Sequence, residues 1–371
     1  MDWLTIGLII FVISWLQILC AYLIYLERKV AAWVQDRKGP NRVGPWGLFQ
    51  PIADGLKFLF KEQVVPAHVH RFLYILAPSI AVITTMLAFA VVPFGPTDVP
   101  DPRQKRFIIA PNLDIGLLFI FAIASLNVYS IILGGWASNN KYSLLGSLRS
   151  AAQIISYEIP LALSVLGVIV LVGSLNLEHL LNEQARLGIG GWLIWYQPLG
   201  WLLFFASALA ESNRLPFDLP EAEQELVGGY HTEYSGMKFA MFFLGEYTHV
   251  TTVSLLMVIL YFGGWHFPFV AEFNANYPGA TGVKVLVLWT KASLVILVIM
   301  LLRWTLPRFR FDQLMHLAWM GLVPLSLLNL LSVMIVRHWS LSPWLLLPCS
   351  VIILTAIPLL HRWKSRQLDW A

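Results

Sequence analysis

Long hydrophobic segments, separated by short polar ones, recur along the whole of this chain. A helix needs about 20 apolar residues to cross roughly 30 Å of hydrocarbon, and about nine segments approach or exceed that length. The predicted spans are 3–26, 72–93, 112–136, 151–172, 192–210, 238–264, 283–303, 313–336 and 342–360. Prolines inside four of them are tolerated where neighbouring helices satisfy the freed carbonyls. The pattern predicts an all-α polytopic membrane protein, a single integral membrane domain over residues 1–371.

The positive charges of the connecting segments predict the orientation of these spans. If the N-terminus lies outside, Lys and Arg are roughly three times as frequent in the inner segments as in the outer ones, which is the positive-inside pattern. An odd number of spans then places the C-terminus inside as well. Two inner connections stand out in this arrangement, a long loop at 27–71 and an acidic loop at 211–237.

The long inner loop contains a segment, 46–62, that is too short and too charged to span a membrane. One face of it is apolar at helical spacing, and the opposite face carries charges. The apolar residues are Leu48, Phe49, Ile52, Leu56, Leu59 and Phe60, and the charged ones are Asp54, Lys57 and Lys61. This pattern predicts an amphipathic helix lying in the inner interface. By itself such a helix is either a simple anchor or part of a site.

The composition supports the membrane interpretation and limits the chemistry. Hydrophobic residues make up 58% of the chain and charged ones 12%, about half the charged share of a soluble domain. The two cysteines, Cys20 and Cys349, cannot hold an iron–sulfur cluster, and no CxxC zinc pattern occurs. We therefore expect no bound metal and no redox centre in this chain, so another chain must bring any electrons. The net charge of +4 does not suggest nucleic acid.

The second inner loop concentrates negative charge on the side where the topology predicts positive charge. Between 211 and 233, many acids accompany a single arginine, Arg214. These acids are Glu211, Asp218, Glu221, Glu223, Glu225 and Glu233. Asp218 and Glu221 fit an N-cap and capping box at the start of a short helix. Capping does not account for the other carboxylates, which form either a solvated acidic face or part of a proton path.

Several ionisable residues lie inside or at the ends of predicted spans. The acids are Glu158, Glu211 and Glu246, and His249 follows Glu246 by one turn. A charge at the bilayer centre costs at least about 2.5–3.5 kcal/mol, so such residues usually face a polar interior and mark an ion or proton path. The alternative is a buried ion pair, for instance Lys291 with a glutamate. The three glutamates together favour the proton path, whereas Arg303, at an inner helix end, is interpreted as a topology charge.

Several motifs resemble one family over most of the chain. They include Gln35-Asp-Arg-Lys-Gly-Pro-Asn-Arg-Val-Gly-Pro, Ser156-Tyr-Glu-Ile-Pro, Phe242-Phe-Leu-Gly-Glu-Tyr and Pro307-Arg-Phe-Arg-Phe-Asp-Gln-Leu-Met. In order, from about residue 20 to 335, they resemble membrane subunit 1 (also lettered H) of complex I, a proton-translocating quinone oxidoreductase. The resemblance implies a subunit that docks the hydrophilic arm and builds much of the chamber for a quinone headgroup.

The resemblance also implies roles for individual residues. The expected quinone-binding residues are Glu27, Arg28, Asp54, Lys57, Arg214, Phe217, Asp218 and Tyr230. The expected proton path comprises Glu158, Glu211, Glu221, Glu223, Glu225, Glu233 and Glu246. The implied partners are iron–sulfur and quinone-site subunits of the hydrophilic arm, small membrane subunits, antiporter-like subunits and membrane lipid.

Two further motifs resemble the cyanobacterial and chloroplast branch of that family. They are Gly229-Tyr-His-Thr-Glu-Tyr-Ser-Gly-Met-Lys-Phe and Leu260-Tyr-Phe-Gly-Gly-Trp, with Lys238 a departure from the wider pattern. This branch implies plastoquinone, a thylakoid membrane, and ferredoxin or NAD(P)H as electron donor. Two other classes stay open, an ion-translocating subunit of a hydrogenase-type complex and a stand-alone secondary transporter. The long inner loop with its amphipathic helix favours a quinone entrance over both.

Overall fold

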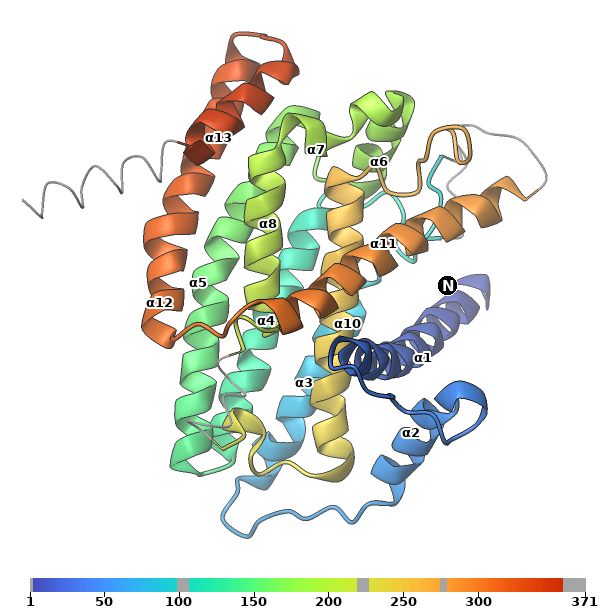
Figure 1. Cartoon of the computed structure of the whole chain (residues 1–371), viewed down its shortest axis with the longest axis vertical. Helices are drawn as coiled ribbons and strands as arrows, with labels where there is room; N and C mark the ends of the chain where they lie inside the picture. Colours follow the sequence, from blue (N-terminus) through green and yellow to red (C-terminus); the bar gives the residue numbers. More distant parts are fainter. Residues whose placement is uncertain (1–2, 99–106, 219–226, 274–278, 356–371) are drawn as a thin grey trace, which may run out of the picture.

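The computed structural model describes residues 3–98, 107–218, 227–273 and 279–355. Helices make up nearly all of the regular structure in these ranges (Figure 1). They are α1 Trp3–Val34, α2 Gln50–Phe60, α3 Arg71–Ala88, α4 Gly116–Ala137, α5 Lys141–Val172, α6 Leu177–Arg186, α7 Leu193–Tyr196, α8 Pro198–Glu211, α10 Gly236–Tyr261, α11 Ala280–Thr305, α12 Phe311–His316 and α13 Val323–His338. The expected all-α fold is confirmed for the described residues.

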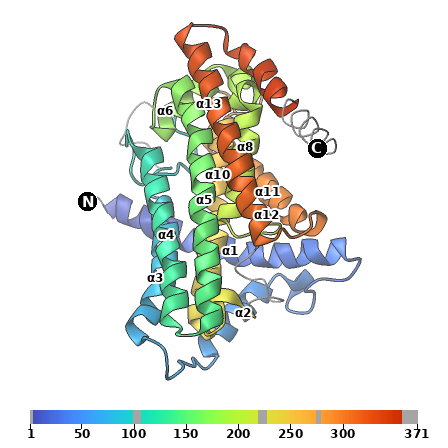
Figure 2. The ribbon, with the colours of Figure 1, turned by 90° about the vertical axis from the view of Figure 1, so that its left-hand side faces the viewer.

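The helices form one bundle crossed by two others. Helices α3, α4, α5, α8, α10 and α13 run side by side, whereas α1 and α11 cross the bundle obliquely (Figures 1 and 2). Helix α10 lies at the centre, packed against α3, α11 and α1. From Tyr247 to Tyr261 every one of its residues is buried. The bundle therefore encloses the segment that carries Glu246 and His249.

Seven helices in the described ranges are long and apolar enough to cross a membrane: α1, α3, α4, α5, α10, α11 and the continuous helix Phe311–His338. Helix α5 begins at Lys141, well before the predicted 151, and extends about 48 Å at 1.5 Å per residue. Helix α1 continues to Val34, past its predicted end at Leu26, so the inner loop that follows is shorter than 27–71.

The prediction of one span over 192–210 is wrong. The chain breaks at Gln197, and α8 starts at Pro198. Proline disfavours helical backbone in the residue before it and fits the first turn of a new helix. With 14 residues, α8 is about 21 Å long, less than the hydrocarbon thickness. The predicted last span also appears as a shorter apolar helix, Pro343–Thr355, within the described residues.

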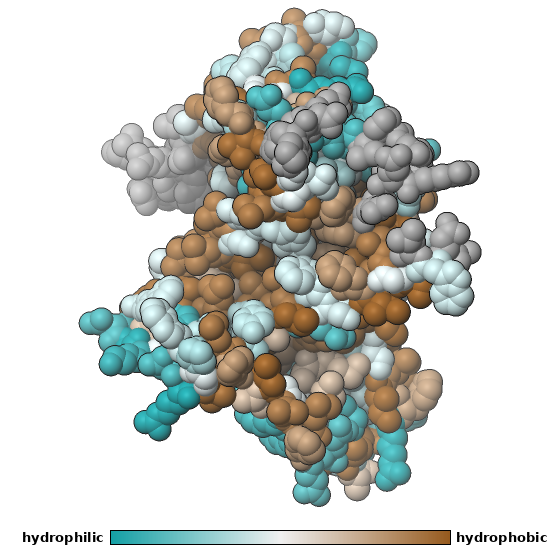
Figure 3. Space-filling view, turned by 90° about the vertical axis from the view of Figure 1, so that its right-hand side faces the viewer, coloured by the Kyte–Doolittle hydropathy of each residue, from teal (hydrophilic) through white to brown (hydrophobic). Residues whose placement is uncertain are grey.

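The surface fits a lipid environment. On the face shown in Figure 3, hydrophobic side chains cover the middle and hydrophilic ones gather toward the two ends. The amphipathic helix is confirmed as α2, and its residues Ile52, Leu56 and Leu59 are exposed. The chain is thus an integral membrane protein with an apolar helix face uncovered beside the bundle.

The predicted orientation can be tested by labelling. Single cysteines at Asn41 and Glu183, in a background without Cys20 and Cys349, should react with a membrane-impermeant maleimide from opposite sides. Asn41 should react from the inner side, because it belongs to the positively charged loop. A label on the C-terminal tail should react from the same side as Asn41. Reaction of the tail from the other side would show that the number of spans is even.

Candidate functional site

A buried carboxylate on α1 binds two arginines from distant parts of the chain. Glu27 accepts hydrogen bonds from Arg214 Nη1 at 3.0 and 2.9 Å and from the Tyr247 hydroxyl at 2.7 Å. Arg303, at the end of α11, also binds it. Glu27 is 6% exposed. We call Glu27, Arg214, Tyr247 and Arg303 the arginine cluster.

The arginine cluster is held by ion pairing and by stacking. The Arg214 guanidinium lies 4.3 Å from the centre of the Tyr247 ring. Burial lowers the pKa of Arg214, but the charge of Glu27, the Tyr247 phenol and the Glu246 carboxylate raise that pKa further. Its pKa therefore lies above the ordinary value, and the guanidinium stays charged. Arg214 interacts with carboxylates on two sides, Glu27 and Glu246.

The segment after α8 is fixed to the segment before α12. Asp218 accepts a hydrogen bond from Arg308 at 3.1 Å, and the Phe217 ring stacks on Phe309 with centroids 5.7 Å apart. Gln153 of α5 donates to the Phe217 carbonyl at 2.7 Å. Phe217 and Asp218 are both buried. Two of the expected quinone residues thus lie beside the arginine cluster on a well-anchored loop.

Two other expected quinone residues tie α2 to α1. Arg28 donates to Asp54 at 2.6 Å, and Gln50 donates to the same carboxylate at 3.1 Å. Lys57 is exposed, one turn further along α2. This pair sits next in sequence to Glu27, so the amphipathic helix begins its course beside the arginine cluster.

The three carboxylates predicted from the spans lie on three different helices. Glu246 of α10 accepts from the Tyr230 hydroxyl at 3.1 Å, and Glu211 lies at the end of α8 with its Oε1 3.7 Å from His249 Nε2. Glu158 of α5 accepts from Ser125 of α4 and interacts electrostatically with Glu211. We call Glu246, Glu211 and Glu158 the carboxylate row.

Small cavities accompany both groups of residues. Two cavities of about 20 Å³ each are lined by Asn127, Glu211 and His249 together, and one of them also by Glu246 and Tyr230. A third, of about 10 Å³, lies beside Glu27. A cavity needs roughly 10–15 Å³ to hold a water molecule. Each of the two larger cavities therefore has room for about one water and is far too small for a quinone ring.

Not every expected residue joins these groups. Glu233 lies apart, where it accepts a hydrogen bond from Asn140 at the start of α5 at 2.8 Å. Glu221, Glu223 and Glu225 lie outside the described residues. The pairing of Lys291 with a glutamate is wrong. Lys291 Nζ instead donates to the carbonyls of Phe262, Gly264 and His266 at 2.7, 3.0 and 2.7 Å.

Sequence reasoning misses several residues of the site. It interprets Arg303 as a topology charge, but Arg303 binds Glu27. Tyr247 follows Glu246 directly, and nothing in the sequence indicates that it reaches Glu27. Ser125 and Asn127 are ordinary polar residues in an apolar span, and only their nearness to a carboxylate reveals them. The signal available in sequence is a polar residue inside a span, which on its own does not identify its partner.

These features define a class: a polytopic helical membrane protein with a buried arginine cluster and a row of buried carboxylates. The chain belongs to the NADH dehydrogenase family, whose model matches residues 6–334. It is 46% identical over 311 residues to the H subunit of NADH-quinone oxidoreductase from Protochlamydia amoebophila, covering 84% of this chain and 90% of that protein. The resemblance to membrane subunit 1 of complex I is thereby confirmed.

Two further relatives carry similar names, each an H subunit of NADH-quinone oxidoreductase that is numbered 1. The one from Geobacter metallireducens is 46% identical over 326 residues, covering 88% of this chain and 93% of that protein. The one from Cytophaga hutchinsonii is 43% identical over 314 residues, covering 85% of this chain and 91% of that protein. The likeness therefore extends over most of both chains in each comparison.

Proposed function

We propose that this chain is the membrane subunit of a proton-translocating quinone oxidoreductase, with no redox centre of its own. The arginine cluster and the adjoining α1–α2 junction receive the quinone headgroup, and the carboxylate row carries protons away from it. Family membership and the names of the relatives support the complex. The assignment of the two groups of residues is our own inference from their geometry.

The observation that carries this proposal is the position of Arg214. Its guanidinium binds Glu27 in the arginine cluster and interacts with Glu246 in the carboxylate row. A change of charge at one carboxylate therefore changes the electrostatic energy at the other, through a cation that stays protonated. This arrangement gives quinone reduction a physical means of altering proton affinity in the row.

The quinone entrance fits the α1–α2 junction. Helix α2 leaves its apolar face uncovered, and Arg28 and Asp54 fix it beside Glu27. An isoprenoid tail matches an apolar surface, and a few polar groups orient a headgroup. Because the cavity beside Glu27 holds about 10 Å³, a full chamber needs walls from partner subunits. Subunits of the hydrophilic arm would supply them, with Lys57, Phe217, Asp218 and Tyr230 on the side of this chain.

The carboxylate row has a direction. Glu246 and Glu211 share a cavity near the loop after α8, and Glu158 is half-buried between α4 and α5. A proton that reaches Glu158 is thus near the flank of the bundle. Antiporter-like and small membrane subunits docked there would take it over. Glu221, Glu223, Glu225 and Glu233 would supply the entrance from the acidic loop.

The branch of the family remains part of the proposal. The motifs around Gly229 and Leu260 support the cyanobacterial and chloroplast branch. That branch implies plastoquinone as the quinone, ferredoxin or NAD(P)H as the donor, and the thylakoid as the membrane. Analysis of the quinone extracted with the purified complex would identify the species directly.

Purification of the tagged chain from mild detergent tests the proposal. We expect iron–sulfur subunits to copurify, together with a bound quinone and quinone reductase activity. A chain that comes alone would support a stand-alone transporter and contradict the proposal. Iron–sulfur subunits without quinone and without quinone reductase activity would instead support a hydrogenase-type complex.

A further inference from the structure

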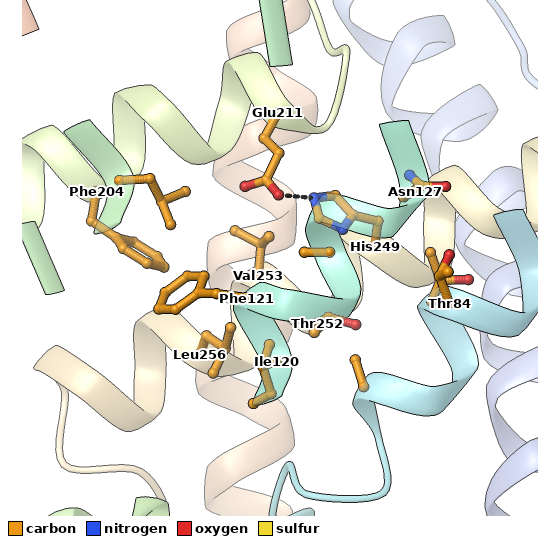
Figure 4. Close-up of a pocket in the computed structure, with 14 residues that line it drawn as sticks. Thr84, Ile120, Phe121, Asn127, Phe204, Glu211, His249, Thr252, Val253 and Leu256 are labelled. Carbon is orange, nitrogen blue, oxygen red and sulfur yellow. Dashed lines mark ion pairs between the residues drawn. The ribbon is translucent and has the colours of Figure 1, made fainter. Parts of the chain in front are cut away.

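His249 lies where the two larger cavities meet. One cavity runs from Glu246 and Tyr230 to His249, and the other from His249 past Thr84 and the apolar residues around them. Figure 4 shows the His249 ring between Asn127 and Glu211, with its ring nitrogen directed at the Glu211 carboxylate. A side chain on α10 thus separates a space beside one carboxylate from a space beside another.

The polar contacts of this ring are incomplete. His249 is 9% exposed, and its Nε2 has no hydrogen-bond partner within the described part of the chain. The 3.7 Å to Glu211 Oε1 is too long for a direct hydrogen bond. An unsatisfied buried nitrogen costs about 1–3 kcal/mol, which a purely structural role does not offset. A water in the shared cavity, or a small approach of the two side chains, would complete the contact.

The surroundings of His249 change from polar to apolar along α10. On one side lie two titratable groups from other elements, Glu211 of α8 and Tyr230 of η4 (Gly229–His231), as well as Glu246 on its own helix. On the other side Thr84 and Thr252 are followed by an apolar roof. The residues of this roof are Ile120, Leu161, Phe204, Val253 and Leu256. Water and protons can therefore reach His249 from the side of Glu246 but not continue through the roof.

We propose that His249 is a proton-relay residue that connects Glu246 with Glu211 through one water in each cavity. Nδ1 accepts a proton from the water beside Glu246 while Nε2 gives its own proton to the Glu211 carboxylate. The imidazole is left as the other neutral tautomer and resets by rotation of the ring. The apolar roof keeps the proton from passing straight along α10, so it leaves through Glu211 toward Glu158.

The inference rests on the proposed function, and its test uses the whole purified complex in proteoliposomes. His249→Gln keeps a polar amide in the cavity but cannot carry a proton from one side to the other. We expect the rate of quinone-driven proton translocation to fall by about tenfold or more. The solvent deuterium isotope effect on that rate should rise, because proton transfer becomes limiting. A merely structural change would not alter the isotope effect.

His266→Gln is the matched control, since His266 is also buried but accepts a hydrogen bond from Trp192 at 3.3 Å, which a glutamine oxygen can accept equally. It should translocate protons like the parent. If His249→Gln does so too, the relay is excluded. His249→Asn serves as the second variant should the glutamine complex not assemble. Glu211→Gln separates the two proposals: parent-like translocation there contradicts the proton path itself, whereas loss there with normal His249 variants contradicts only the relay.

Discussion

Glu27→Gln is expected to lower the free energy of unfolding by about 3–5 kcal/mol, the usual effect of removing one partner from a buried ion pair. The Arg214 guanidinium would stay buried and charged without its counter-ion. Thermal denaturation of the purified complex, followed by loss of its intact band on a native gel, measures the change. Quinone reductase activity should fall with it.

The Arg28–Asp54 pair provides the control for this substitution. It has the same chemistry, but the Arg28 side chain is 49% exposed and the Asp54 side chain 21%. Exposed pairs contribute about 0.2–1 kcal/mol, so Asp54→Asn should change the stability only slightly. Equal losses in the two variants would show that burial of the arginine cluster does not determine its contribution.

Glu211→Gln is expected to reduce quinone-driven proton translocation by roughly 100-fold or more, the range for loss of a positioned acid–base group. The amide fits the same space beside His249 but cannot bind and release a proton. Acidification of proteoliposomes that contain the complex measures the rate. Glu183→Gln is the control, because Glu183 pairs with Arg186 at the exposed end of α6. Normal translocation in Glu211→Gln would assign this carboxylate a structural role.

Most of the fold could be predicted because apolar length determines which segments span. The errors occurred where local backbone chemistry overrides hydrophobicity. Pro198 divides one apolar segment into α7 and α8, and Lys141 begins a helix inside a predicted loop. Helix α6 was not predicted, although Asn176 caps it by accepting from the Glu178 backbone N–H at 2.9 Å. A capping signal between two hydrophobic segments carries more information than the hydropathy does.

The site could be predicted as a set of residues but not as a set of contacts. A charged residue inside a span indicates a polar interior, which identified Glu158, Glu211 and Glu246 correctly as buried or half-buried groups. Partners come from helices far apart in sequence, as Glu27 and Arg303 do. Lys291 shows the same limit, since backbone carbonyls offer a cation a partner that no sequence pattern displays.

The apolar roof beside His249 determines where a membrane potential acts on the protein. An electric field falls mainly across the least polarisable stretch, and α10 beyond Thr252 is buried and almost wholly apolar up to Tyr261. Moving one elementary charge through 100 mV costs about 2.3 kcal/mol. Protonation of Glu246 and Glu211, on the near side of the roof, therefore proceeds almost without electrical work. The voltage opposes translocation at a later step, in whichever subunit receives the proton from Glu158.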